Sequence, residues 1–306
     1  MGSQARILVA TDLSEPADEA VRQAHAWARA EDAELWVYHV TPRLLGSHML
    51  FPRLVEESAL DQPPLQSQVV EVLRERTERL TGRTPDQYRL VVDAGTPYVE
   101  IVRQGERLGA SLVVVGSHGR SGLAHVFLGD VAERVVRYAH SPVLVARARA
   151  RPLEHRREIL VATDFSSSAV AAITAAAEQA RRRGAHLTAL RSIERRVETL
   201  TWIATFGGTG YQFVRDEYQA ERAQAEKRLA ALLRRVGAPG DVRVTDGEPA
   251  SAIVHAAGEL DAELVVIGAT GLSGLRRMVV GSVAEKVSRA APCSVLVVRP
   301  LPSQAR

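Results

Sequence analysis

Several common features of protein sequences are scarce in this chain of 306 residues. Its one cysteine, Cys293, has no partner for a disulfide within the chain, and no Cys or His residues show zinc-finger spacing. Lysine occurs only as Lys227 and Lys286, so arginine supplies nearly all the positive charge of a protein with pI 9.3 and formal net charge +3. Hydrophobic burial must therefore hold the fold, and this small charge gives little support for a nucleic-acid partner.

Long apolar runs are also missing. No stretch approaches the roughly 18 consecutive apolar residues that a membrane helix requires, and the first twelve residues contain no apolar signal core. The composition, 46% hydrophobic and 25% charged, is that of an ordinary globular protein. We therefore expect a cytoplasmic protein without a membrane partner, with length for about two domains.

The sequence contains one long internal repeat. Ile7–Asp12 reads Ile-Leu-Val-Ala-Thr-Asp, and Ile159–Asp164 repeats it at an offset of 152 residues. Further pairs at this offset are Gly95 and Gly247, Pro97 and Pro249, Gly116 and Gly268, Gly119 and Gly271, and Gly129 and Gly281. One offset over the full length indicates two homologous domains. We place them at residues 1–148 and 156–306, on either side of an arginine-rich connector.

Short apolar runs alternate with longer segments of helical period in each copy, which is typical of parallel strands joined by helices. The pattern predicts strands at 5–10, 34–40, 87–92, 112–116 and 142–146 of the first copy. Ser14 and Pro16 are typical of the start of a helix after the first strand. Runs such as Leu112–Val115 are apolar at every position, so helices should cover both faces of the sheet. The predicted fold class is α/β: two Rossmann-like domains, each with five parallel strands.

Candidate functional residues follow the first and fourth strands of each copy. With strand order 3-2-1-4-5, the order reverses between these two strands, and ligands bind such sheets at the reversal. In the second copy, spaced glycines precede a predicted helix, and a glycine loop with a helix N-terminus favours a phosphate group. We expect Ser282 at the helix cap, Arg276 or Arg277 to add charge, and the Asp164 carboxylate to face the loop and accept from a ribose hydroxyl or an adenine-side donor. Alone, however, Ser282 also fits an ordinary cap and Asp164 an ordinary turn residue.

The second copy resembles the universal stress protein family in its tandem, ATP-binding form. Members that bind ATP have Gly, two residues, Gly, nine residues, Gly, and then Ser or Thr, as Gly268, Gly271, Gly281 and Ser282 do here. The resemblance covers nearly the whole chain and implies domains of the adenine nucleotide alpha hydrolase-like type, with ATP, alone or with Mg²⁺, as cofactor. The implied site consists of Ala162, Thr163, Asp164, Ser192, Gly268, Gly271, Gly281, Ser282 and Val283. The corresponding first-copy residues are Asp12, Val40, Gly116, Gly119 and Gly129. The family also implies pairing through the last strands, in a homodimer or as a pseudo-dimer within the chain.

The first copy departs from this motif at Asp130, which follows Gly129 where the motif has Ser or Thr. A carboxylate at a helix cap would occupy the anion site from within and repel phosphate. We therefore predict that ATP prefers the second copy. The alternative is that Mg²⁺ bridges Asp130 to phosphate, so that both sites fill.

Other nucleotide chemistries lack their motifs. No lysine follows a glycine as in a Walker A loop, and the dinucleotide-binding fingerprint and the Gly-x-Ser-x-Gly elbow are missing. No catalytic set or metal-ligand set is identifiable. We therefore expect a nucleotide-responsive stress or signalling module, with two alternatives: a slow ATPase or nucleotidyl-transfer enzyme, and an interaction scaffold that binds no nucleotide.

Three further segments have two interpretations each. Thr201–Phe213 mixes aromatics with glycines and is either a functional loop, as a flap over the nucleotide or a partner-docking surface, or a loop packed on its own domain. His118, within the first glycine loop, is either a phosphate contact or, as we prefer, an exposed loop residue. Arg181–Arg183 is either a nucleic-acid contact or, as we prefer, a solvated surface.

Overall fold

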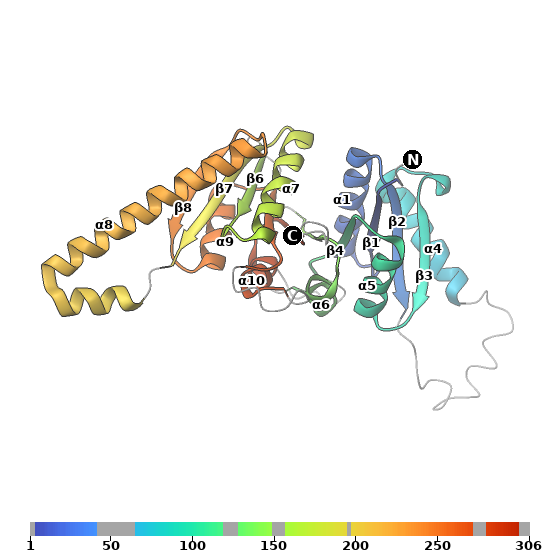
Figure 1. The fold of residues 1–306 in the computed structure, drawn as a ribbon. Coiled ribbons are helices and arrows are strands. Elements are labelled where there is room, and N and C mark those ends of the chain that lie inside the picture. The colour runs from blue at the N-terminus through green and yellow to red at the C-terminus, as the bar shows by residue number, and fades with distance from the viewer. Residues whose placement is uncertain are drawn as a thin grey trace, which may run out of the picture. The chain divides into compact units, whose positions relative to one another are not determined.

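The structure, a computed structural model, describes residues 4–41, 65–118, 128–148, 157–194, 197–271 and 280–299. The chain divides into two compact units, Met1–Ala148 and Arg149–Arg306. Each unit alternates strands with helices along the chain (Figure 1).

The first unit is a parallel sheet in the order β3-β2-β1-β4-β5. Its strands are β1 (Arg6–Ala10), β2 (Glu34–Thr41), β3 (Arg89–Ala94), β4 (Leu112–Gly116) and β5 (Val143–Ala146). Its helices are α1 (Glu15–Glu31), α4 (Leu65–Thr81), α5 (Pro97–Leu108) and α6 (Asp130–Tyr138), with a short 3₁₀ helix, η1 (Pro85–Gln87). All five strands expected from the sequence are present.

The second unit repeats this architecture in the order β8-β7-β6-β9-β10. Its strands are β6 (Glu158–Ala162), β7 (His186–Ile193), β8 (Asp241–Asp246), β9 (Leu264–Gly268) and β10 (Ser294–Val298). Its helices are α7 (Ser167–Arg183), α8 (Val197–Arg235), α9 (Pro249–Glu259) and α10 (Ser282–Ala290). Both units therefore have the predicted order 3-2-1-4-5 in their own count, and the predicted fold class is confirmed. The order reverses between β1 and β4 and between β6 and β9.

Serine caps begin the first helix of each unit, as predicted for Ser14. The Ser14 hydroxyl accepts from the N–H of Ala17 at 3.4 Å, and the Ser166 hydroxyl accepts from the N–H of Ala169 at 3.2 Å. The faces that these helices turn toward the sheet are rich in buried alanine, including Ala24 of α1. Small side chains let the helix backbone approach the sheet closely, which positions the turn that precedes each helix.

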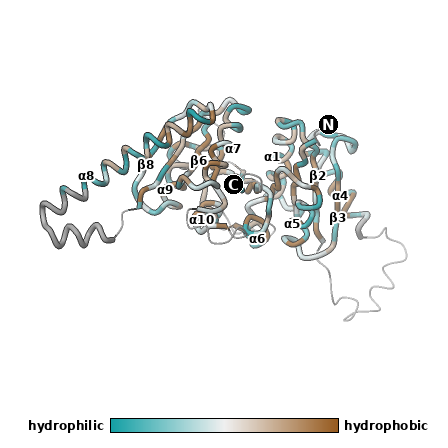
Figure 2. The backbone as a smooth tube through the Cα atoms, viewed as in Figure 1, coloured by the Kyte–Doolittle hydropathy of each residue, from teal (hydrophilic) through white to brown (hydrophobic). Residues whose placement is uncertain are grey.

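The sheets form the centre of each hydrophobic core. Leu112–Val115 and Leu264–Ile267 are buried at every position, which agrees with helices on both faces of each sheet. In the second unit, α7 packs against α8 while α9 packs against α10. Figure 2 shows hydrophobic residues along the strands and polar residues along much of α8.

The prediction of a loop at Thr201–Phe213 was wrong, because the backbone of this segment belongs to α8. The glycines of the segment suggested a flap, since glycine is a poor helix former. No proline interrupts residues 197–235, however, so the helical hydrogen-bond ladder can continue past these glycines.

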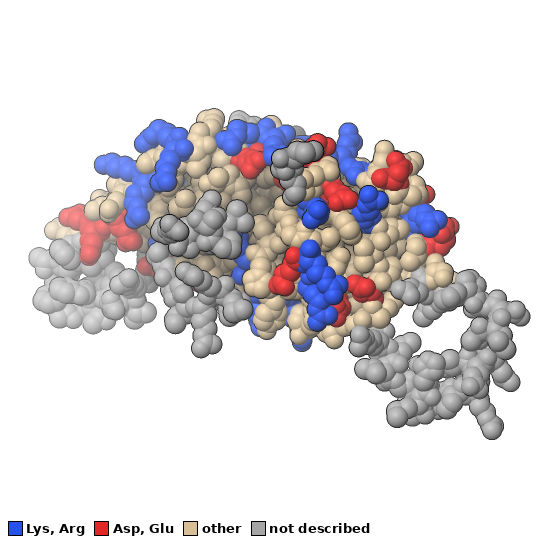
Figure 3. Space-filling model, turned by 45° about the vertical axis from the view of Figure 1, so that its right-hand side comes forward, with Lys and Arg blue, Asp and Glu red and all other residues tan. Residues whose placement is uncertain are grey.

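Charged side chains on the described surface are largely paired locally. At the end of α7, Arg182 forms a salt bridge with Glu178 at 2.5 Å, and Arg183 donates to Gln179 at 3.1 Å. Figure 3 shows acidic and basic side chains interspersed on the first unit. These contacts agree with the solvated-surface interpretation of Arg181–Arg183. Within the described residues, no helix has the length and apolar character needed to cross a bilayer.

Candidate functional site

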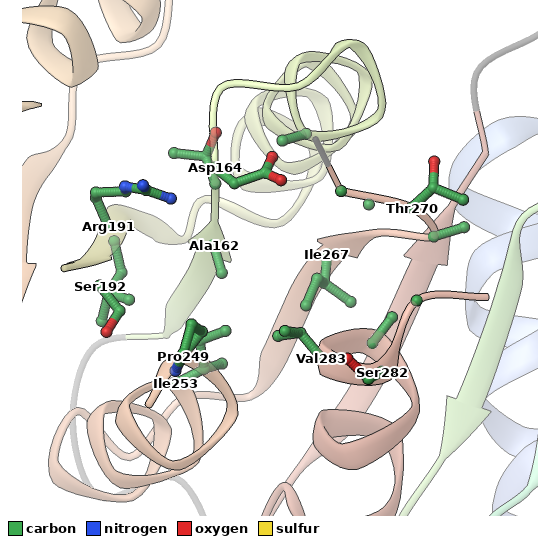
Figure 4. Close-up of a pocket in the computed structure, with 18 residues that line it drawn as sticks. Ala162, Asp164, Arg191, Ser192, Pro249, Ile253, Ile267, Thr270, Ser282 and Val283 are labelled. Carbon is green, nitrogen blue, oxygen red and sulfur yellow. The ribbon is translucent and has the colours of Figure 1, made fainter. Parts of the chain in front are cut away.

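A cavity of about 240 Å³ lies at the carboxyl ends of β6 and β9 (Figure 4). All nine residues predicted for the second copy line it: Ala162, Thr163, Asp164, Ser192, Gly268, Gly271, Gly281, Ser282 and Val283. The structure thus brings the turn after β6, the glycine loop after β9 and the start of α10 to one place. The nucleotide contacts assigned to these residues stay a prediction.

The turn after β6 holds the Asp164 carboxylate in a fixed orientation. Its Oδ1 accepts from the N–H of Ser166 at 2.9 Å, and the Thr163 hydroxyl accepts from the N–H of Phe165 at 2.9 Å. Phe165 has φ +66°, a left-handed conformation that is uncommon outside glycine. Leu13 has φ +62° at the same place in the first unit. Backbone strain of this kind is often found at binding sites.

The glycine loop begins where the backbone of α7 lies against the end of β9. A Cβ atom on Gly268 would lie 2.7 Å from the Ser168 hydroxyl and 2.8 Å from its carbonyl carbon. No other residue fits this position without displacing α7. Gly268 therefore allows the two elements to converge.

Asp164 and the loop face each other across the cavity, as the sequence predicts. A Cβ atom on Gly271 would lie 2.7 Å from Oδ2 of Asp164. In Figure 4 the carboxylate points toward the loop that carries Thr270. The Ser166 hydroxyl also donates to the carbonyl of Thr270 at 3.4 Å, which joins the turn to the loop.

The start of α10 differs from the prediction in one respect. Gly281, and not Ser282, is the cap residue, and Ser282 is the first residue of the helix. Gly281 has no side chain with which to cap α10, and the first helical hydrogen bond runs from the N–H of Glu285 to its carbonyl at 3.1 Å. The N–H groups of Ser282, Val283 and Ala284 precede this ladder, at the positive end of the helix dipole. They provide anion-binding donors beside the cavity.

Helix α9 and strand β7 form the remaining wall. The Ser192 hydroxyl donates to the carbonyl of Gly247 at 2.7 Å, so its oxygen is held in place. Pro249 and Ile253 of α9 add apolar surface. Pro249 and Ile253 are not part of the glycine motif, so they were not assigned to the site from the sequence. Pro249 repeats Pro97 at the 152-residue offset, and this repeat could have identified Pro249 as a site residue.

Glu248 joins α9 to α10 next to this wall. Its carboxylate accepts from the N–H of Ser251 at 2.8 Å and from the Lys286 ammonium at 2.9 Å. These two hydrogen bonds lower the pKa of Glu248 from 4.5 to about 2, and the bond from the Ser251 N–H has the larger effect. The carboxylate is therefore ionised over the physiological range and links the start of α9 to α10 through Lys286.

The first unit has a corresponding cavity of about 320 Å³. Of the residues predicted for this copy, Asp12, Val40, Gly116 and Gly129 line it, while Gly119 lies outside the described residues. Tyr38 also lines this cavity, and its hydroxyl donates to Asp93 at 2.7 Å. Burial, and to a smaller extent the Asp93 carboxylate, raises the pKa of Tyr38.

The structure corrects the expected role of Asp130. Gly129 is the cap residue of α6, so Asp130 is not a cap and its carboxylate does not occupy the helix N-terminus from within. Instead it accepts from Nε of Arg134 at 2.9 Å, one turn along the helix. Asp130 still lines the cavity, so it places a partly compensated negative charge where the second unit has Ser282.

Two histidines of the first unit, His39 and His118, differ in their surroundings. His39 is buried, and its Nδ1 lies 2.8 Å from the carbonyl oxygen of Thr11. The prediction that His118 is exposed was wrong, because it is half-buried and lines the cavity. Its Nδ1 lies 2.9 Å from the Ser117 hydroxyl. Within the described residues, no three His, Cys, Asp or Glu side chains form a group that could hold a metal ion.

The family model that describes the universal stress protein family matches residues 5–147 and 155–299. The chain belongs to the universal stress protein family. Two matches in succession make it a tandem member, as the sequence resemblance predicts.

Known relatives agree with this assignment. A universal stress protein of Mycolicibacterium smegmatis is 29% identical over 314 residues, which cover 96% of this chain and 97% of that protein. One from Methanocaldococcus jannaschii is 27% identical over 154 residues, 47% of this chain and 95% of its own length. A solved universal stress protein of Archaeoglobus fulgidus has the same fold, with TM-score 0.64 at 22% identity, over 98% of this chain and 97% of that one.

Proposed function

We propose that this universal stress protein binds ATP, mainly in its second unit, and acts as a nucleotide-responsive stress or signalling module. The observation that carries the proposal is the convergence of Asp164, the glycine loop and the start of α10 on one cavity. A carboxylate and a row of backbone N–H groups on facing walls suit a ligand with hydroxyl donors at one end and phosphates at the other.

The arrangement of the walls supports one orientation of the nucleotide. The phosphates would lie at the loop and the N-terminus of α10, where the helix dipole favours negative charge. The ribose would lie beside Asp164, whose carboxylate oxygens accept hydrogen bonds from hydroxyl groups. The base would contact the apolar wall that Leu190 and Ile253 form near Ser192.

Magnesium would enter this site with the triphosphate. Among the described residues that line the second-unit cavity, Asp164 is the sole carboxylate. Mg²⁺ in nucleotide sites is usually held by substrate phosphates, water and one or two carboxylates, so the residues present fit this mode. ATP with bound Mg²⁺ is therefore part of the proposal.

The difference between the units rests on residues 130 and 282. Asp130 lines the first cavity with a negative charge that Arg134 compensates only in part, since both side chains are largely exposed to solvent. Ser282 offers a neutral hydroxyl at the same point of the second cavity. The Asp130 carboxylate repels a triphosphate in the first cavity, whereas the Ser282 hydroxyl donates a hydrogen bond to it in the second cavity.

Exchange of these two residues tests the proposal. Saturation at 100 times the dissociation constant stabilises a protein by about 2.7 kcal/mol, which a thermal-shift titration with MgATP detects. We expect Ser282→Asp to remove most of the ATP-dependent shift of the wild type and Asp130→Ser to keep or increase it. Asp164→Asn should weaken the shift, whereas Asp12→Asn, its matched control in the first unit, should leave it largely unchanged.

The same titration decides between the proposal and its alternatives. No shift at millimolar ATP in the wild-type protein would favour a scaffold that binds no nucleotide. ATP hydrolysis or nucleotidyl transfer that disappears in both Asp164→Asn and Ser282→Ala would favour an enzyme. The homodimer through the last strands stays a prediction.

A further inference from the structure

Two arginines flank the aromatic ring of Phe165 at the edge of the second-unit site. The guanidinium carbon of Arg228, on α8, lies 4.1 Å from the ring centroid, and that of Arg191, on β7, lies 5.7 Å from it. Both distances allow cation–π attraction. Phe165 directly follows Asp164 and has a left-handed backbone. The turn after β6 therefore places the Asp164 carboxylate next to the aromatic ring that Arg191 and Arg228 contact.

The two guanidinium groups lack a carboxylate partner within the described part of the chain. Most other arginines in this unit are paired, as Arg222 is with Glu226 at 3.3 Å and Arg243 is with Glu259. Both guanidinium groups are positively charged and contact the same ring, so an anion that binds near Phe165 would be attracted by both.

The first unit shows how such an arginine can be neutralised. There α4, the helix that precedes β3, directs Arg76 to Asp18 of α1, and the carboxylate accepts two hydrogen bonds at 2.5 and 3.0 Å. The residue 152 positions after Asp18 is Val170, so the second unit has no carboxylate at this place. Likewise, the position of Arg191 is held in the first unit by His39, which is buried against Thr11. The cationic pair is a feature of the second unit.

Arg191 lies at the opposite end of the cavity from the phosphate-binding loop, and Arg228 contacts the Phe165 ring beside it. Arg191 lines the cavity, and Figure 4 shows it on the other side of Asp164 from Thr270. The Asp164 carboxylate faces Gly271 and so points away from the guanidinium group of Arg191. An anion beside Arg191 would therefore meet the cations before it meets the carboxylate. The cavity has a positive helix terminus at one end and the Arg191 guanidinium at the other, and the Arg228 guanidinium contacts the adjacent Phe165 ring.

We propose that Arg191 and Arg228 form a second anion subsite, which binds a phosphate group on the ribose of the nucleotide. This inference rests on the proposed function, because the position of the ribose beside Asp164 comes from it. Guanidinium groups match a phosphate group with parallel hydrogen bonds, and a dianion exploits both cations. The preferred ligand class is then a nucleotide that is phosphorylated on both sides of its ribose.

Paired ligands and matched variants test the subsite. Calorimetric titration compares adenosine 3′,5′-bisphosphate with adenosine 5′-monophosphate, which differ only in the ribose phosphate. We expect the bisphosphate to bind the wild type about tenfold more tightly or better, the gain of a charge-assisted contact. Arg191→Gln and Arg228→Gln should each reduce this ratio severalfold. Arg222→Gln, which removes the same charge from an exposed position on α8, should preserve it.

The outcomes separate the inference from the proposed function. If ATP and the monophosphate bind but the bisphosphate shows no advantage, the subsite is overturned while the proposed function stands. An advantage that survives in both Arg191→Gln and Arg228→Gln overturns it too. Arg228→Lys keeps the charge but loses the planar fork, so an intermediate ratio supports the subsite and a wild-type ratio argues against it. If none of the nucleotides binds the wild-type protein, the proposed function itself fails.

Discussion

Replacement of Gly271 by alanine perturbs the proposed site at its narrowest point. The added Cβ would lie 2.7 Å from Oδ2 of Asp164, about 0.7 Å short of the 3.4 Å at which ordinary contacts begin. The carboxylate must rotate or the loop must retreat. Rotation sacrifices the hydrogen bond from the N–H of Ser166 to Oδ1, which at 2.9 Å is charge-assisted and contributes about 1.5–3 kcal/mol.

The cost should appear mainly in ligand binding. If half of that energy, about 0.75–1.5 kcal/mol, is lost from the bound state, ATP affinity falls about three- to tenfold, because 1.4 kcal/mol corresponds to a factor of ten. Calorimetric titration of Gly271→Ala with MgATP measures this loss. Gly258→Ala is the matched control, since a Cβ there meets nothing within 4 Å and alanine is favoured in a helix. Affinity within about twofold of the wild type in Gly271→Ala would refute the reasoning.

Two predictions concern stability. Gly268→Ala forces a Cβ to 2.8 Å from the backbone of Ser168, so overpacking should lower the free energy of unfolding by about 1–3 kcal/mol. Urea denaturation measures this change. An unchanged denaturation midpoint would contradict the close approach of α7 to β9. Glu248→Gln should be less stable than the wild type at pH 7. Because the folded-state pKa of Glu248 is depressed to about 2 from 4.5, its contribution is complete above pH 4.5 and is lost as the pH falls toward 2. Thermal melts of both proteins across this range should therefore converge at acid pH, and a constant difference would contradict the assigned cause.

Much of the fold could be predicted because local and long-range signals agree. The unbroken apolar run at Leu264–Ile267 indicates a strand covered on both faces, and the 152-residue offset shows that the pattern occurs twice. The strand order then places Asp164 and Gly268 at one edge of the sheet, and the structure brings both to the same cavity. Each step needs only periodicity and the geometry of parallel sheets.

The sequence-based predictions that were wrong concern features that depend on tertiary contacts. Glycines near Gly207 suggested a loop, yet the backbone there continues the helix α8. The caps of α6 and α10 are one residue earlier than expected, because glycine can hold the extended cap conformation as well as serine does. The grouping of Phe165 with Arg191 and Arg228 joins residues far apart in the sequence, and no local pattern predicts it. The domain boundaries 1–148 and 156–306 stay a prediction.

The stoichiometry of MgATP binding to the full chain, measured by isothermal titration calorimetry, is the decisive test of ATP binding in the second unit. We expect one site per chain that Asp164→Asn weakens strongly and that Asp12→Asn leaves intact. Two equal sites per chain, or an affinity unchanged by Asp164→Asn, would contradict it.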